Sequence, residues 1–276
     1  MLLIWWQLVH KKVLIATIFN LTMETPPHIQ VIFENEDFAV LNKERGMPTA
    51  PLKEGDYSLL TEFLKTQSIN EEVIGKKEIE RGLIHRLDTP TTGLVLIAKK
   101  QKIFDFLSFM QEKNKIEKEY IAYCDILKTK DFPTQIYPNN KSFEIKSSFL
   151  PCGKHRRKVK IDFGADRKIY TTKIMLEAPL IDIFQRKAKQ TKVKCILTQG
   201  YRHQVRCHLA SIGLPILNDA LYNTKYIEEH KEKIEDEIAR HNYKLELYAT
   251  KLTIPSPYSP NEQLSFSLQI LDKKNQ

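Results

Sequence analysis

Cysteine is scarce in this chain and follows no pattern that metal or disulfide chemistry would need. The 276 residues include four cysteines, which form neither a CxxC pair nor a Cys/His arrangement with zinc spacing. So few cysteines in a chain of this length favour reduced thiols. We therefore expect a cytoplasmic protein without a structural metal.

The sequence also lacks internal repeats, low-complexity tracts, obvious linkers and any long heptad pattern. Its hydrophobic content of 42% is ordinary for a soluble globular protein. The length would allow one large core or two modest domains. Without a linker, we expect one domain over residues 23–276, and a monomer is the default expectation.

The first 22 residues match neither a membrane span nor a complete signal peptide. Two apolar stretches flank His10-Lys11-Lys12, and each lysine near the centre of a span would cost about 2.5–3.5 kcal/mol. Tryptophans stand where a signal peptide needs a cationic start, and no small-residue cleavage site follows. We interpret residues 1–22 as a mis-assigned N-terminal extension, with a signal peptide as the alternative.

Positive charge is in excess and is concentrated in one region. The formal net charge is +9, and residues 141–200 hold 15 Lys/Arg against 5 Asp/Glu. This balance favours a polyanionic partner such as nucleic acid. Alternating segments on both sides of residues 154–158 predict a hairpin that contacts phosphates, although a solvated hairpin face is the alternative.

Residues 85–99, HRLDTPTTGLVLIAK, combine a charged pair, a turn and an apolar strand. Arg86 and Asp88 are two apart, so an extended backbone would point both to one side. Pro90 and Gly93 supply turn chemistry, and residues 94–98 predict a buried strand. Loops held by buried strands often carry catalytic groups. The alternative is a surface ion pair, worth at most about 1 kcal/mol.

This segment resembles the signature of the RluA-type pseudouridine synthases, which reads roughly HRLDxx(T/S)(S/T)GLLLxAK. Three further segments resemble motifs of that family in the same order. They are Lys118–Ala122 for its KxYxA strand, Gly200–Ala210 for its GRxHQ(I/L)RxHLA helix and Leu247–Leu252 for its closing LHAxxL strand. Four motifs in register across residues 29–270 make a specific signal.

The resemblance implies an α+β fold with a central mixed, largely antiparallel sheet and with flanking helices and loops around a catalytic cleft. It also implies isomerisation of uridine to pseudouridine in ribosomal or transfer RNA, a reaction without a redox step that needs no cofactor. Asp88 would be the nucleophile, Arg206 its ionic partner, and Tyr120 would stack on the base and help remove the carbon-5 proton. The residues expected to contact RNA are His85, Arg86, which would fill the gap left by the flipped nucleotide, Lys43, Arg202, His203 and Gln204.

Some positions depart from the family pattern. Tyr201 replaces the first arginine of the GRxHQ motif, and Tyr248 stands where histidine is usual. Asn218-Asp219 stands where the family prefers Gly-Asp, and Asn223 replaces a glycine. These departures spare Asp88, Tyr120 and Arg206, so the expected reaction is unaffected. They leave open the finer RNA contacts and the choice of target.

The residues around Arg206 predict a helix with an anionic partner. Val205, Leu209 and Ile212 have the spacing of a core-facing stripe. Arg202 and Arg206 would then stack at i, i+4, which is unfavourable unless an anion neutralises them. A buried carboxylate or an RNA phosphate would serve, and two solvated side chains are the alternative.

Other patterns predict the surrounding elements. Residues 29–33 and 38–42 read as paired strands, and residues 57–65 as a helix. A helical stripe runs through Ile103, Phe106, Leu107 and Met110. Residues 226–240 read as one charged helix, interpreted as a weakly packed insertion with a structural role.

Two other functions fit parts of the pattern. One is an inactive RNA-binding protein of the same fold, and the other is a nucleosidase-type hydrolase with an aspartate. A hydrolase would release free uracil, whereas an isomerase leaves the RNA chain intact.

Overall fold

The computed structural model describes residues 29–66, 73–127, 140–164, 167–179, 182–183, 189–241 and 243–270. The predicted extension over residues 1–22 lies outside the described residues. Among the described helices, none combines the length and the apolar character that a membrane crossing requires.

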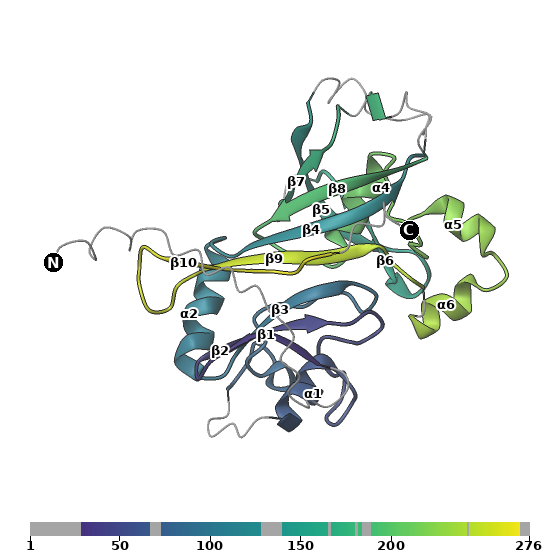
Figure 1. The fold of residues 1–276 in the computed structure, drawn as a ribbon. Coiled ribbons are helices and arrows are strands. Elements are labelled where there is room, and N and C mark those ends of the chain that lie inside the picture. Colours follow the sequence, from purple (N-terminus) through teal and green to yellow (C-terminus); the bar gives the residue numbers. More distant parts are fainter. Residues whose placement is uncertain are drawn as a thin grey trace.

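Ten strands form one sheet that runs through the whole molecule (Figure 1). Their order is β1-β2-β3-β9-β4-β8-β7-β5-β6, with β10 paired to β9. The pairs are antiparallel except β3–β9, which is parallel, so the fold is α+β with a largely antiparallel sheet, as predicted. The strands are β1 (Gln30–Glu34), β2 (Phe38–Lys43), β3 (Thr92–Ala98), β4 (Glu117–Asp125), β5 (Ser142–Cys152), β6 (Lys158–Asp162), β7 (Tyr170–Leu176), β8 (Gln190–Leu197), β9 (Leu247–Pro255) and β10 (Gln263–Ser267).

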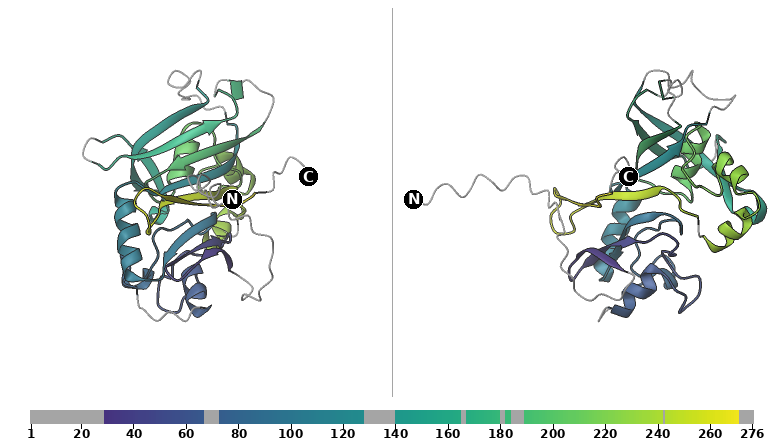
Figure 2. Two further views of the ribbon diagram at one scale, coloured as in Figure 1. Left: turned by 60° about the vertical axis from the view of Figure 1, so that its left-hand side comes forward. Right: turned by 45° about the vertical axis from the view of Figure 1, so that its right-hand side comes forward.

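Short helices cover both faces of this sheet (Figure 2). They are α1 (Leu59–Thr66), α2 (Gln101–Glu112), α4 (Gln204–Ser211), α5 (Thr224–Glu229) and α6 (Ile234–Arg240), with single 3₁₀ turns η1 (Glu78–Glu80) and η2 (Lys154–Arg156). The predicted helix over residues 57–65 is observed as α1, and the predicted stripe from Ile103 to Met110 lies on α2.

The core has two main parts, one on each side of β3. Val95 and Ile97 face the larger cluster together with α1, whereas Leu94 and Leu96 face the smaller cluster together with α2. Because both faces of β3 are covered, its sequence is a continuous apolar run rather than an alternating one. The predicted buried strand is therefore confirmed.

Gly93 allows β3 to approach β9 directly after the Asp88 turn. Its φ is +133°, and a Cβ atom there would lie 2.3 Å from the carbonyl oxygen of Ala249. Any side chain would push apart the one parallel pairing of the described sheet.

The basic segment forms a hairpin, as predicted. Residues 148–152 of β5 pair with residues 158–162 of β6, and η2 lies in the connection. The alternating sequence on both sides of the basic run sets this register.

The prediction of a single helix over residues 226–240 is wrong. The segment forms two helices, α5 and α6, with α5 capped at His230. Ile227 and Ile234 are seven apart, and no apolar residue continues their stripe through the charged turn between them. The segment is also better packed than predicted, since Tyr226 is buried and α6 packs against the larger cluster through Ile234 and Ile238.

Candidate active site

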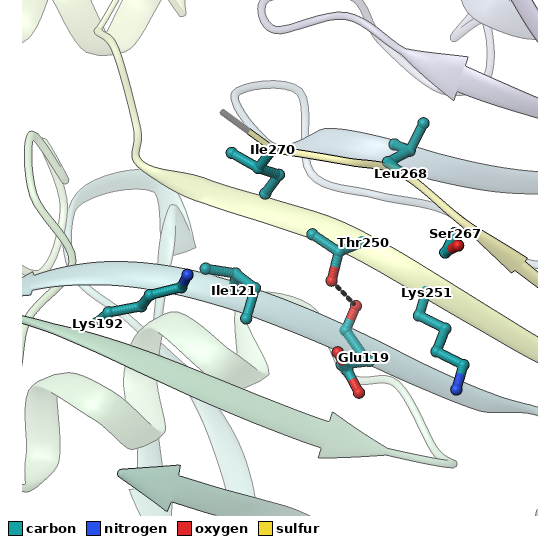
Figure 3. Close-up of a pocket in the computed structure, with 8 residues that line it drawn as sticks. All are labelled: Glu119, Ile121, Lys192, Thr250, Lys251, Ser267, Leu268 and Ile270. Atoms are coloured by element: carbon teal, nitrogen blue, oxygen red, sulfur yellow. Dashed lines mark hydrogen bonds between the residues drawn. The ribbon is translucent and has the colours of Figure 1, made fainter. Parts of the chain in front are cut away.

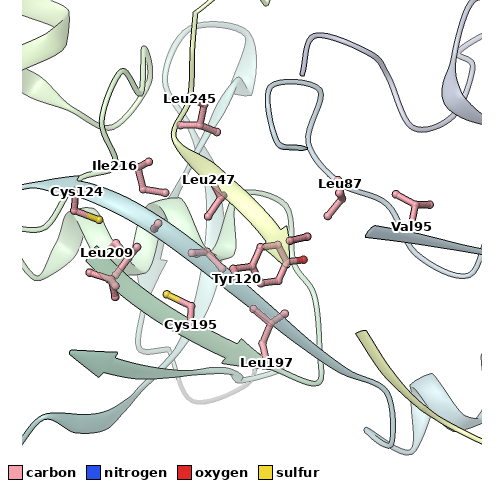
Figure 4. Close-up of a cluster of buried hydrophobic side chains, with 14 of the residues drawn as sticks. Leu87, Val95, Tyr120, Cys124, Cys195, Leu197, Leu209, Ile216, Leu245 and Leu247 are labelled. Carbon is pink, nitrogen blue, oxygen red and sulfur yellow. The ribbon is translucent and has the colours of Figure 1, made fainter. Parts of the chain in front are cut away.

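Asp88, Arg206 and Tyr120 come from three separate elements and converge on one region. Asp88 lies in the loop before β3, where its carbonyl accepts a hydrogen bond from Thr91 N at 2.9 Å. Its Oδ2 lies 3.6 Å from Nη1 of Arg206 on α4, and the two side chains are 22% and 1% exposed. Tyr120 is buried on β4 and points toward the loop that carries Leu87 (Figure 4). A nearly buried cation therefore faces a partly open carboxylate.

The segment after β2 holds the Asp88 loop on both sides. Thr49 Oγ1 donates to the carbonyl of Leu87 at 2.7 Å and accepts from its N–H at 3.1 Å. Gly46 N donates to the carbonyl of Thr89 at 3.0 Å. These bonds bracket Asp88 in the sequence and fix the direction of its side chain.

Lys43 completes this attachment from inside the protein. Its Nζ donates to the carbonyls of Glu44, Met47 and Thr89 at 2.8, 2.8 and 3.0 Å. Burial lowers the pKa of Lys43 to about 7, against the opposing effect of the Asp88 charge. The fully buried ammonium of Lys43 therefore links the Asp88 loop to the segment after β2, and its contact with RNA stays a prediction.

Asp219 is the main partner of Arg206. Its carboxylate accepts from Nε at 2.8 Å and from Nη2 at 2.7 Å, the bidentate geometry that suits a guanidinium. Nη2 also donates to Tyr243 Oη at 3.2 Å, and the rings of Tyr222 and Tyr243 lie 5.4 and 5.9 Å from Arg206 Cζ. Nη1 is buried without a hydrogen-bond partner and is the nitrogen nearest Asp88.

The charges of this cluster offset its burial. Burial opposes the charge of Arg206, but the Asp219 carboxylate and then Tyr243 outweigh it and raise the pKa of Arg206. Burial likewise opposes the charge of Asp219, and Arg206 reverses this and lowers the pKa of Asp219. Both groups are therefore ionised in the folded protein at neutral pH.

His203 is another ionisable group beside Asp88. It precedes α4 in a left-handed conformation with φ 57°, and its Nε2 lies 3.9 Å from Asp88 Oδ2. Its Nδ1 hydrogen-bonds to Tyr222 Oη at 3.1 Å. Burial lowers the pKa of His203 to about 4, although the Asp88 charge opposes the shift. The ring is therefore neutral at pH 7 and carries one N–H.

The predicted stacking of Arg202 on Arg206 does not occur. Helix α4 begins at Gln204, so Arg202 lies outside it. Its Nη2 donates to the carbonyls of Arg156 and Lys158 at 2.7 and 3.3 Å and braces the basic hairpin. The expected buried carboxylate is present for Arg206 in the form of Asp219.

The other predicted RNA contacts divide into exposed and internal residues. The side chain of Arg86 is 58% exposed and pairs with Glu80 at 2.9 Å. Gln204 is buried and donates to Thr171 O and Thr172 Oγ1 at 3.0 and 2.9 Å, which argues for a structural role instead of an RNA contact. His85 is also buried, but neither of its ring nitrogens has a hydrogen-bond partner.

A pocket on the opposite face of the sheet takes no part in this cluster (Figure 3). Glu119 and Ile121 line it and alternate with Tyr120 along β4, so they point away from Asp88. Its other lining residues are Lys192, Thr250, Lys251, Ser267, Leu268 and Ile270.

Known proteins resemble this chain in sequence and in fold. A sequence model described as RNA pseudouridylate synthase matches residues 37–211, which is more than half of the chain. The chain is 30% identical over 224 residues to "Ribosomal large subunit pseudouridine synthase D" of Borreliella burgdorferi, covering 79% of this chain and 61% of that protein. It is 27% identical over 203 residues to "Ribosomal large subunit pseudouridine synthase C" of Buchnera aphidicola, covering 72% of this chain and 55% of that protein.

Among solved structures, the fold is similar to that of "Human RNA Pseudouridylate Synthase Domain Containing 1". The TM-score is 0.59 at 16% identity, and the match covers 88% of this chain and 84% of the human chain. "Human RNA Pseudouridylate Synthase Domain Containing 4" gives a TM-score of 0.58 at 15% identity, covering 88% of both chains. At such low identity, these two matches speak for the fold alone.

Proposed function

Because this chain belongs to the RNA pseudouridylate synthase family, we propose that it isomerises uridine to pseudouridine in RNA with Asp88 as nucleophile. The observation that carries this proposal is the pairing of a partly open Asp88 with a buried Arg206, 3.6 Å apart. Asp219 fixes the rest of the guanidinium, so its free nitrogen stays directed at Asp88.

The proposed reaction exchanges one bond to the sugar for another. Asp88 adds to carbon 1′ of the ribose as the bond to uracil N1 breaks, and the base leaves as an anion. After the base has rotated, its carbon 5 bonds to carbon 1′ and the carboxylate leaves. Carbon 5 then loses a proton and N1 gains one, so neither mass nor oxidation state changes. The target nucleotide must leave its stack to reach the site.

Arg206 supports the first step because the attacking carboxylate has to be ionised. Its Nη1 is a buried donor without another acceptor, and a partner for the carboxylate needs this property. Asp219, Tyr243 and Tyr222 hold the guanidinium from other directions, so Arg206 needs no reorganisation during the reaction.

Tyr120 suits stacking on the target base and a part in the final proton transfer. Burial, and after it the Asp88 charge, raises the pKa of Tyr120, so it enters the reaction as a neutral phenol. A phenol can take the carbon-5 proton while passing its own to Asp88, which is free again at that stage. This relay agrees with the role that the sequence predicts for Tyr120.

Ribosomal or transfer RNA is the proposed substrate. The names of the two bacterial relatives refer to the large ribosomal subunit, which favours ribosomal RNA. The β5–β6 hairpin offers phosphate contacts through Lys154, Arg156 and Arg157, whose side chains lie at the surface. Four free cysteines fit work in the cytoplasm, and a monomer stays a prediction.

Release of the carbon-5 hydrogen tests this function. Large-subunit ribosomal RNA carrying tritium at carbon 5 of uridine should release tritium with the wild-type protein and no free uracil. Asp88→Asn should abolish release while RNA binding stays within a few-fold. Asp105→Asn, an exposed carboxylate on α2, should behave like wild type.

Three results would contradict the proposal. Release of free uracil would indicate a hydrolase. Lack of tritium release on the RNA of the protein's own source would favour an inactive RNA-binding protein. Normal turnover by Asp88→Asn would exclude Asp88 as the nucleophile.

A further inference from the structure

We propose that Lys118, His85 and the main chain at Gly200 bind a backbone phosphate of the RNA, at a nucleotide flanking the target. This inference rests on the proposed function only for the identity of the anion. The site is separate from the Asp88–Arg206 pair and draws on residues that the proposed mechanism does not use.

The side chains of Lys118 and Tyr120 lie on the same face of the sheet. The two residues are two apart on β4, so their side chains point to one side and lie about 7 Å apart along the strand. Lys118 is 5% exposed, and a Cβ atom on Gly200 would lie 3.7 Å from its Nζ. The ammonium group therefore lies against the backbone just beyond β8.

In the part of the chain that the structure describes, Lys118 has no counter-ion, and its Nζ forms no hydrogen bond with any side chain. Burial, and after it the positive charge of Lys76, lowers the pKa of Lys118 to about 8. The neighbouring Glu119 points to the opposite face and pairs with Lys194 at 3.0 Å. The carboxylate next to Lys118 on β4 thus forms its ion pair with a different lysine.

His85 adds a second unpaired group, on which the charge of Lys118 acts. It is 8% exposed, and both ring nitrogens are buried without a hydrogen-bond partner. Burial, and after it the charge of Lys118, lowers the pKa of His85, so the ring is neutral at pH 7 and has one N–H to donate. Buried polar groups are normally hydrogen-bonded, so the two ring nitrogens of His85, both without a partner, indicate a missing ligand.

The chemistry of the cluster selects an anion that accepts hydrogen bonds. The charged members of the cluster, Lys118 and Lys76, are both positive. Lys118 and His85 both offer N–H donors. Gly200 and Lys76 are exposed, so the cluster reaches the surface. RNA supplies one phosphate per nucleotide, and the distance from Tyr120 assigns this phosphate to a neighbour of the flipped nucleotide.

The test measures RNA binding, not catalysis. A fluorescent single-stranded oligouridylate is titrated at several KCl concentrations, and the dissociation constant is plotted against salt on logarithmic axes. Lys118→Met removes the charge and keeps an apolar stem in a buried position. We expect about tenfold weaker binding at low salt and a salt slope smaller by about 0.7, the value for one phosphate contact on a single strand.

Lys194→Met is the matched control, since it removes a lysine from the opposite face of the same sheet. Its salt slope should equal that of wild type. Lys118→Arg should keep most of the slope, and Lys118→Gln replaces Lys118→Met if the latter does not fold. Unchanged affinity and slope in a folded, uncharged Lys118 variant would overturn the inference.

The two proposals fail in different ways. If wild type forms pseudouridine and the uncharged Lys118 variant has a normal salt slope, the phosphate site is wrong and the proposed function stands. If wild type binds RNA through Lys118 but releases no tritium from its substrate, the phosphate site stands and the proposed function is wrong.

Discussion

Arg206 and Lys118 are both buried cations, but the fold treats them in opposite ways. Arg206 is surrounded by acceptors, with Asp219, Tyr243 and Asp88 all within 3.6 Å of its guanidinium nitrogens. Lys118 has a glycine backbone, a neutral histidine and another lysine as neighbours. A buried charge with opposite charges beside it inside the protein needs no ligand to neutralise it. A buried charge without such a partner is suited to bind an ionic ligand.

Arg206→Ala should have the largest effect, because it leaves Asp219 buried without its cation. We expect the free energy of unfolding to fall by about 3–5 kcal/mol and pseudouridine formation to cease. Urea unfolding followed by circular dichroism measures the loss. The double variant Arg206→Ala/Asp219→Ala should be more stable than Arg206→Ala, since the unpaired carboxylate is then gone. A double variant that is no more stable would show that the charge is not the cause.

Asp219→Asn should sharpen the same side of the comparison with a smaller effect. The substitution keeps the shape of the side chain but removes a charge and one acceptor, so Arg206 is less firmly aimed at Asp88. We expect kcat to fall about 100-fold with KM unchanged, the usual scale for a misplaced catalytic group. Steady-state initial rates of tritium release from labelled RNA provide the measurement.

Asp125→Asn is the control for that variant. Asp125 is also a buried acid, bonded to Asn223 and Lys225 at 2.8 Å each, but it makes no contact with Arg206. It should lower stability without lowering kcat. Equal losses of kcat in both variants would reduce Asp219 to a structural residue.

The pH dependence of stability tests the Lys118 side and should show the smallest effect. Burial followed by the Lys76 charge lowers the pKa of Lys118 to about 8 in the folded state, against 10.5 in the unfolded chain. Between these values the unfolded chain binds a proton that the folded protein lacks, so the free energy of unfolding rises with pH. The limit for this group is about 1.4 kcal/mol per pH unit.

Comparison of wild type with Lys118→Met between pH 8 and 10.5 isolates this contribution, because the other titrating groups are common to both. The wild-type curve should be the steeper one. The same slope in both proteins would mean that Lys118 carries no depressed pKa and is not the unpaired cation described above.

The sequence predicted what depends on local pattern. The turn at Pro90, the buried run of β3, the helix at Arg206 and the fold class all follow from spacing or from motifs in register. The proximity of Asp88 and Arg206 was expected from the family resemblance, since they lie far apart in the chain.

The sequence did not predict the partners of Arg206 or the burial of Lys43, because both depend on tertiary packing. Asp219 and Tyr243 are 13 and 37 residues beyond Arg206, and no periodicity links them to it. The Asn218-Asp219 pair was the available signal for Asp219, because it occupies a motif position. Lys43 looks like any surface lysine in the sequence, and only the fold shows that three carbonyls enclose it. The break between α5 and α6 did have a signal in the sequence, because the charged turn between Ile227 and Ile234 holds no apolar residue.

The most direct measurement compares pseudouridine maps of total RNA from cells that lack this protein, complemented with wild type or with Asp88→Asn. The account predicts that one or a few uridines lose their modification in the deletion and regain it with the wild-type protein alone. An unchanged map in the deletion, or full restoration by Asp88→Asn, would contradict the central role of the Asp88 carboxylate.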